Sequence, residues 1–334
     1  MTSLSQHIDS KAIRRLRRMA LNTIITLYLV VMAGGVVRST GAGMGCPDWP
    51  RCFGTWIPPT EVSELPHNYK EIYGAKLKGE VEFNPVKTWI EYINRLLGVL
   101  TGFMIFLTLL STLPFWNIRR QLVWLGLSGF LLVAFQGWLG SKVVSFELHP
   151  VMVTLHMFVA IIIVGILTHL YFIASRMFKG VVFPAAPKIS KIGILVLILT
   201  LVQVMLGTQV RENIDEVVRM LGYDARQSWI DELDFRFYIH RSFSIVVLGA
   251  NLYWFYLIKK NMLVYSTVGN LIKGCVVILG LETMTGIIMA YFGVPAFAQP
   301  LHLTMGILLM GLQYIVFLRT RPSKDFIGGT EKVS

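Results

Sequence analysis

Eight stretches of about 20 apolar residues, nearly free of charged side chains, recur along this chain of 334 residues. A segment of that length is what an α-helix needs to cross a bilayer core about 30 Å thick. The composition agrees, because 54% hydrophobic and 15% charged residues depart far from the balance of a soluble domain. The predicted spans are 19–37, 91–113, 120–141, 152–175, 191–210, 237–258, 268–291 and 299–318. The sequence therefore predicts an all-α integral membrane protein with eight transmembrane helices.

The net charge of +12 comes from basic residues gathered in short segments on one side of the predicted spans. Such an excess marks cytoplasmic segments, so we expect both termini in the cytoplasm and no nucleic-acid partner. The loops 38–90 and 211–236 are then exported. The Arg-rich start is compatible with a mitochondrial transit peptide, but its short length and Asp9 favour a bacterial inner (plasma) membrane.

The two halves of the chain share polar as well as apolar positions, which predicts an internal repeat. Segment 92–95 matches 238–241, the pair 155–156 matches 301–302, and Gln136 and Gly140 fall on Glu282 and Gly286, all at an offset of 146 residues. Four spans separate equivalents, so the repeat is parallel and favours two pseudo-symmetric four-helix bundles. The expected division is a tail 1–18, a first bundle 19–176, a linker 177–190, a second bundle 191–320 and a tail 321–334.

Ionisable groups are costly inside a membrane and indicate a function by default, and two of the histidines inside predicted spans stand out. His240 and His302 lie within about one turn of the exported ends of their spans, at about the same depth. Since these spans run in the same direction, facing imidazoles fit both axial positions of a heme iron. A closed zinc site is disfavoured because it requires four ligands. The remaining alternative is that each histidine makes an interhelical hydrogen bond.

Arginines near the exported face are candidates for binding the propionates of a heme, because a guanidinium matches a carboxylate. Arg95 and Arg241 directly follow the ligand positions of the two halves, and Arg38 and Arg211 end spans 19–37 and 191–210. The alternative for each of them is contact with lipid phosphates.

The first half differs from the second at the ligand positions. It has Asn94 at the place of His240, keeps His156 as the counterpart of His302, and adds Glu91. Glu91 and Asn94 are spaced i,i+3 and share a helix face. We therefore expect a heme bound here to have an open iron face beside a carboxylate that can move protons. The alternative for Glu91 is an acid that complements the N-terminal end of a helix dipole.

Two further pairs complete the candidate residues. Gln136 and Glu282 hold equivalent places, where each can accept a hydrogen bond from the second ring nitrogen of a ligand histidine. Cys46 and Cys52 lie in an exported loop, where the compartment favours a disulfide. A redox role for this pair is the alternative. Cys275 is expected to be a packing residue.

These residues carry a resemblance to the heme A synthase family. It rests on segment 34–43 running into Cys46-Pro47-Asp48-Trp49-Pro50, on segment 91–95, and on His156, the pair His240-Arg241 and His302. The resemblance implies oxidation of the C8 methyl of heme O to a formyl group, which gives heme A for terminal oxidases. It also implies a heme b cofactor on His240 and His302, and a substrate heme in the first half with Glu91 as an essential acid.

The resemblance further implies a heme O-producing farnesyltransferase as a partner, a role in cytochrome oxidase biogenesis and an electron donor of unspecified identity. It is compatible with a homo-oligomer. Two positions depart from the family pattern: many members have a second histidine at Asn94, and some carry a cysteine pair in the second exported loop, where 211–236 has none.

Two other functions compete with this interpretation. A membrane b-type cytochrome that only relays electrons has no use for a carboxylate such as Glu91 beside an open iron face. A heme or small-molecule transporter would also have a parallel repeat, but its polar residues are expected near the midplane of the membrane.

Overall fold

The computed structural model describes residues 10–74, 82–146, 148–179, 183–222 and 224–322. Its α-helices are α1 (Ser10–Ser39), α2 (Tyr69–Tyr73), α3 (Pro85–Thr112), α4 (Arg120–Ser145), α5 (Pro150–Lys179), α6 (Pro187–Leu221), α7 (Phe235–Lys260), α8 (Met262–Tyr291) and α9 (Ala298–Thr320). All except α2 are long and apolar enough to cross a membrane, and each contains one predicted span. No β-strand occurs in the described ranges. The prediction of an eight-helix, all-α membrane protein is confirmed.

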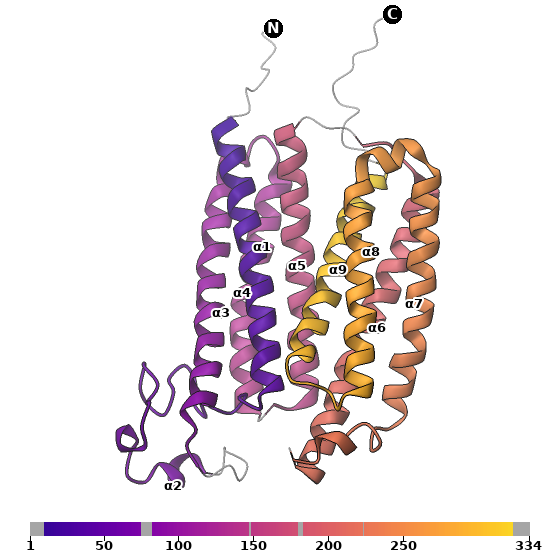
Figure 1. Cartoon of the computed structure of the whole chain (residues 1–334). Helices are drawn as coiled ribbons and strands as arrows, with labels where there is room; N and C mark the ends of the chain where they lie inside the picture. Colours follow the sequence, from indigo (N-terminus) through magenta and orange to yellow (C-terminus); the bar gives the residue numbers. More distant parts are fainter. Residues whose placement is uncertain (1–9, 75–81, 147, 180–182, 223, 323–334) are drawn as a thin grey trace, which may run out of the picture.

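The eight long helices form two groups that stand side by side (Figure 1). In the first group α1 packs on α3 and α5, and α4 packs on the same two helices. In the second group α6 packs on α7 and α9, and α8 does likewise. The order of neighbours is the same in both groups, which supports the expected pair of four-helix bundles. Contacts between the groups come mainly from α9 against α1 and α5.

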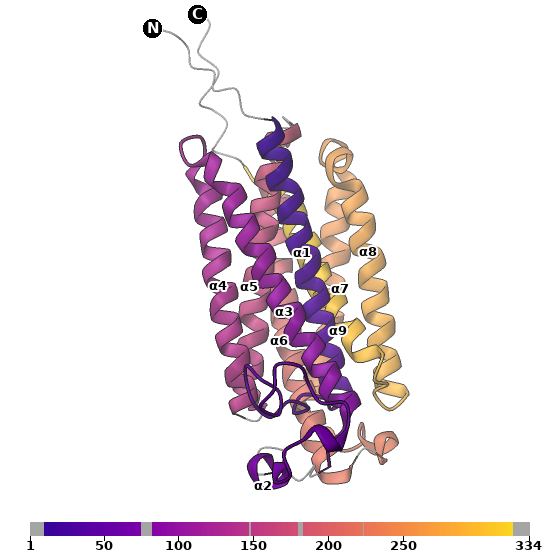
Figure 2. The same cartoon turned by 90° about the vertical axis from the view of Figure 1, so that its left-hand side faces the viewer.

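The two ends of the bundle differ in what they carry. The start of α1 and the end of α9 lie at one end, as an even number of spans requires (Figure 1). Helix α2 and the long loop that contains it lie at the other end, as a second view confirms (Figure 2). Helices α3, α5, α7 and α9 all begin at this loop-bearing end, so the residues in their first turns approach one another there.

Each long helix extends beyond its predicted apolar span at one end or both, as α6 and α8 illustrate. α6 was expected to end at 210 but continues to Leu221, because ion pairs such as Arg211 with Asp215 at 2.8 Å stabilise a polar extension of the helix. α8 was expected from 268 but begins at Met262, where the Asn261 side chain caps it by accepting from the Val264 N–H at 3.2 Å. Hydropathy locates the membrane core and not the helix ends.

Small residues allow the two groups to approach closely where α1 meets α9. A Cβ placed on Gly35 would lie 2.8 Å from the Pro300 Cβ, and one on Gly311 would lie 2.5 Å from the Tyr28 hydroxyl. Helices in a membrane associate through such close packing, since lipid provides no hydrophobic driving force between them. This contact fixes α9, and with it His302, against the first group.

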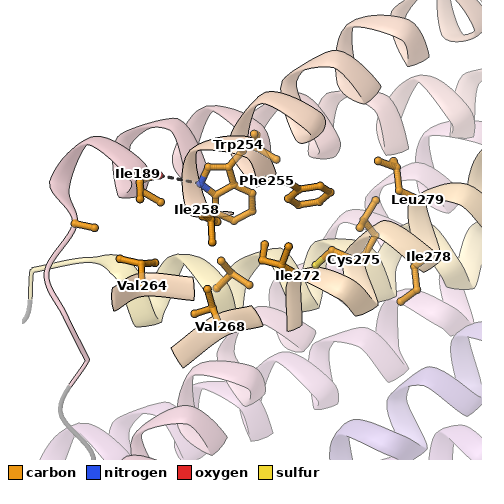
Figure 3. Packing of buried hydrophobic residues seen from close by; sticks show 14 residues of the cluster. Ile189, Trp254, Phe255, Ile258, Val264, Val268, Ile272, Cys275, Ile278 and Leu279 are labelled. Carbon is orange, nitrogen blue, oxygen red and sulfur yellow. Dashed lines mark hydrogen bonds between the residues drawn. The ribbon is translucent and has the colours of Figure 1, made fainter. Parts of the chain in front are cut away.

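A buried apolar cluster holds the second group together near the end that carries the termini (Figure 3). Trp254 is fully buried, and its indole N–H donates to the Ile189 carbonyl at 2.9 Å. The ring lies against Gly193, where a Cβ would be only 2.8 Å away. Cys275 is a buried member of the cluster, which confirms its prediction as a packing residue.

The seam between α1 and α9 generates the first testable prediction. Gly35→Ala should destabilise the protein by about 1–3 kcal/mol, because the added methyl overlaps Pro300 and the helices must separate. Gly98→Ala on α3 is the matched control: nothing lies within 4 Å of its Cβ position, and alanine is favoured over glycine in a helix by about 1 kcal/mol. Thermal unfolding in detergent micelles measures the stability of both variants. Equal unfolding temperatures for the two would contradict the close contact of α1 with α9.

Candidate functional site

His240 and His302 face each other across the second bundle near its loop-bearing end. His240 lies in the first two turns of α7 and His302 in the first two turns of α9. Their ring centroids are 6.3 Å apart and the ring planes make an angle of 76°. The structure therefore brings together the two histidines that the sequence predicts as a pair.

Each of these rings rests on a glycine of the neighbouring helix. A Cβ on Gly207 of α6 would lie 3.2 Å from His240 Cε1, and a Cβ on Gly286 of α8 would lie 3.5 Å from His302 Cε1. The absence of a side chain at these two positions leaves room for the imidazoles to turn toward the space between them.

The neighbours of His302 orient its ring. The Glu282 carboxylate Oε2 lies 2.5 Å from Nδ1, and the Thr285 hydroxyl lies 3.0 Å from the same nitrogen. With Nδ1 occupied in this way, Nε2 is the nitrogen available to a metal. Glu282 thus occupies the place from which the sequence predicts that it orients a ligand histidine.

The pair fits a heme iron by donor set and spacing. Two metal–nitrogen bonds of about 2 Å each, together with the two ring radii, place imidazoles on one ion roughly 6 Å apart. Among the residues that the structure describes, no group of three or more His, Cys, Asp or Glu forms a metal site. A porphyrin supplies the other iron ligands itself, so two imidazoles suffice for a heme but not for a closed zinc site.

The first bundle repeats this arrangement with different ligands. A Cβ on Gly140 would lie 3.4 Å from His156 Cε1, and one on Gly34 would lie 3.8 Å from the Asn94 side-chain oxygen. His156 Nδ1 and Asn94 Oδ1 are buried and have no hydrogen-bond partner among the described residues. Such polar atoms are costly to leave unpaired, so they mark a place for a further group.

Gln136 differs from the expected role. Its Nε2 donates to the backbone carbonyl of His156 at 2.8 Å and not to the ring, using the second lone pair of that carbonyl oxygen. Gln203 of α6 makes the same type of contact to the His240 carbonyl at 3.1 Å. The sequence interpretation missed Gln203, although a lone glutamine in the apolar run 201–206 is a detectable signal.

Glu91 is buried at the start of α3, where it links the helix to the long loop. Its Oε2 accepts from the Cys46 backbone N–H at 2.8 Å, and its Oε1 pairs with Arg95 at 2.5 Å. Arg95 also donates to three loop carbonyls, those of Cys46 and Asp48 at 2.7 Å and that of Arg51 at 3.0 Å. The structure therefore uses the Arg95 side chain to hold the loop against α3.

The loop has a small core of its own. The predicted disulfide between Cys46 and Cys52 is present, and it packs against Phe53, Leu65 and Tyr69. Because Cys46 is also the residue whose N–H meets Glu91, the folded loop fixes the direction of that carboxylate.

The two other arginines predicted near the exported face meet at one carboxylate. Arg38 contacts Asp215 Oδ2 at 2.6 Å, and Arg211 contacts Asp215 Oδ1 at 2.8 Å. The sequence interpretation did not single out Asp215, which lies one helical turn beyond Arg211. Arg241 takes a different position, exposed and over the Phe237 and Tyr238 rings of its own helix.

Comparison with known proteins agrees with this geometry. The sequence model of a family described as "Cytochrome oxidase assembly protein" (COX15-CtaA) matches residues 17–314. A heme A synthase of Listeria welshimeri is 24% identical over 313 residues, which cover 91% of this chain and 95% of the relative. A heme A synthase of Shewanella oneidensis is 27% identical, and the match covers 63% of this chain and 61% of the relative. A heme A synthase of Methylobacterium radiotolerans is 32% identical, and the match covers 53% of this chain and 51% of the relative. The chain thus spans about three fifths of the length of the Shewanella relative and about half of the length of the Methylobacterium relative. Since the family match runs from α1 into α9, the chain belongs to the COX15-CtaA family of cytochrome oxidase assembly proteins.

Proposed function

We propose that this protein is a heme A synthase, an oxidoreductase that converts the C8 methyl of heme O to a formyl group. The observation that carries the proposal is the asymmetry between two otherwise matching sites. One bundle has facing histidines 6.3 Å apart, whereas the other has His156 with Asn94 in the place of the second histidine. The names of the relatives point to the same reaction.

In this proposal the second bundle binds heme b through His240 and His302. A heme with two imidazole ligands supplies one-electron transfer. Glu282 and Thr285 hold the His302 ring by its Nδ1, and Gly207 and Gly286 leave the rings the space to meet one iron. These residues favour a stable, closed ligand set over an open one.

The first bundle, in the same proposal, binds the substrate heme O through His156. Asn94 is a weak iron ligand, so this half offers one strong ligand only. Oxidation of an unactivated methyl requires electrons and an oxidant that side chains do not provide, and an external electron donor is therefore part of the proposal. Arg38 is the candidate for a propionate of this half, and Arg211 and Arg241 are candidates for the other.

Glu91 is the proposed catalytic acid of the first bundle. Only 4% of the residue is exposed, and the Arg95 guanidinium beside it compensates its charge. Removing one member of a buried ion pair leaves the other uncompensated and can cost about 3–5 kcal/mol. Glu91→Ala would therefore disturb the fold as well as the chemistry, and Glu91→Gln, which retains an acceptor for the Cys46 N–H, is the sharper variant.

The membrane orientation is part of the same proposal. The basic segments place both termini in the cytoplasm, so the loop-bearing end, with both heme sites and the disulfide, faces the exported side of the inner membrane. A farnesyltransferase that produces heme O is the expected partner, since it supplies the substrate in the same membrane.

One prediction of the proposed function concerns heme b. His240→Ala and His302→Ala should each lower the bound heme b by at least about tenfold, because each removes an axial ligand. The measurement is the optical spectrum of the purified protein with pigment extraction. His169→Ala is the control: this partly buried histidine contacts the Tyr314 hydroxyl at 2.8 Å and belongs to neither pair. Heme b retained in full by both variants would contradict the ligand assignment.

Another prediction of the proposed function concerns the reaction. In membranes that also contain a heme O-producing farnesyltransferase, the wild type should accumulate heme A, and Glu91→Gln should accumulate heme O while retaining heme b. Chromatography of extracted pigments measures all three. Glu64→Gln, in the same loop but exposed and paired with Thr60, is the matched control. A wild type that contains heme b and leaves heme O unchanged, with electrons supplied, would favour the electron-relay function instead.

A further inference from the structure

Asp215 joins the two halves of the protein at the loop-bearing end. Arg38 of α1 donates to its Oδ2 from Nε at 3.2 Å and from Nη2 at 2.6 Å. Arg211 of α6 contacts its Oδ1 at 2.8 Å and also donates to the Arg38 carbonyl at 2.9 Å. The three side chains are 19–34% exposed, so water screens these contacts only in part.

Both arginines lie one helical turn from a glycine that packs against a candidate heme ligand residue. Arg38 follows Gly34, and Arg211 follows Gly207, at a spacing of i,i+4 that puts each pair on one helix face. Gly207 packs on the His240 ring, and Gly34 lies next to Asn94. Each arginine is therefore displaced by about 6 Å along its helix, toward the loop-bearing end, from the glycine that contacts the candidate ligand residue of its own half.

The internal repeat does not include Asp215. Arg38 and Arg211 are equivalent residues, but the position that corresponds to Asp215 in the first half is the fully buried Ala42. The Asp215 carboxylate thus pairs with two arginines, one from each bundle. The trio carries a net charge of about +1, and without Asp215 two guanidiniums would repel each other at this boundary.

We propose that Asp215 is a positioning residue shared by the two heme sites. It holds Arg38 and Arg211 at the boundary between the bundles, so that each guanidinium points toward the propionates of the heme in its own half. A change of charge or position at one heme site then alters the other site through Asp215. The proposal rests on the proposed function, because it takes both sites to bind hemes. The two hydrogen bonds from Arg38 to Asp215 use Nε and Nη2, so Nη1 can donate to such a propionate.

The test compares Asp215→Asn with two matched variants. Glu216→Gln removes the neighbouring acid, which is similarly exposed but pairs with Arg236 at 2.6 Å. Asp215→Glu retains the charge. The readouts are the midpoint potential of heme b from a spectroscopic redox titration, and separate values of KM and kcat for heme O.

We expect Asp215→Asn to raise the heme b potential, because the loss of a negative charge favours the reduced form. The apparent KM for heme O should rise about tenfold with a smaller change in kcat, as when a residue that orients a binding group is lost. Asp215→Glu should restore both values in large part, and Glu216→Gln should change neither. Arg38→Gln should lower the heme b potential although Arg38 belongs to the other bundle, which keeps the test valid if Asp215→Asn fails to fold.

The proposal is overturned if Asp215→Asn lowers only the unfolding temperature, or if Glu216→Gln shifts both readouts equally. A wild type that produces no heme A would refute the proposed function and remove the KM readout. The heme b potential of the variants would still decide whether Asp215 acts on the second site.

Discussion

The cost of burying polar groups in a membrane is the constraint on which the loop-bearing end of this protein depends. Three carboxylates there each have a partner: Glu91 has the Cys46 N–H and Arg95, Glu282 has His302, and Asp215 has two arginines. Some buried polar atoms in the described part of the chain remain unpaired, and three of them belong to residues that are candidate ligands. His156, His240 and Asn94 each retain a buried polar atom without a partner among the described residues, and they occupy the candidate ligand positions.

The internal repeat explains why so much of this arrangement follows from the sequence. Equivalent residues at a fixed offset predict both the parallel bundles and the depth of His240 and His302, because a helix converts spacing along the chain into height. The disulfide followed from the short separation of two exported cysteines. These predictions depend on periodicity within helices, which a single sequence records directly.

Contacts that depend on how a loop folds were not predictable in the same way. The partner of Glu91 is a backbone N–H that reaches it only because the disulfide and the small apolar core place Cys46 over α3. Asp215 was overlooked because the apolar stretch ends before it, although α6 continues as a helix past it to Leu221. Arg95 was predicted from its position to bind a heme propionate, yet it donates to loop carbonyls, which helical spacing does not reveal.

The differences between the halves follow from what each ligand set can do. In the proposed function, two imidazoles with a glycine beside each ring, and with Glu282 on His302, favour a closed site that changes little as electrons pass. A single histidine opposite an asparagine leaves a site that can admit an exchangeable substrate, provided that something else defines its outer edge. In this protein the disulfide-bonded loop lies at that edge, and Glu91 and Arg95 hold it to the helix that also carries Asn94. Folding of the disulfide-bonded loop and the orientation of Glu91 are therefore coupled in the first bundle, whereas Glu282, which orients His302 in the second bundle, lies on a helix of that bundle.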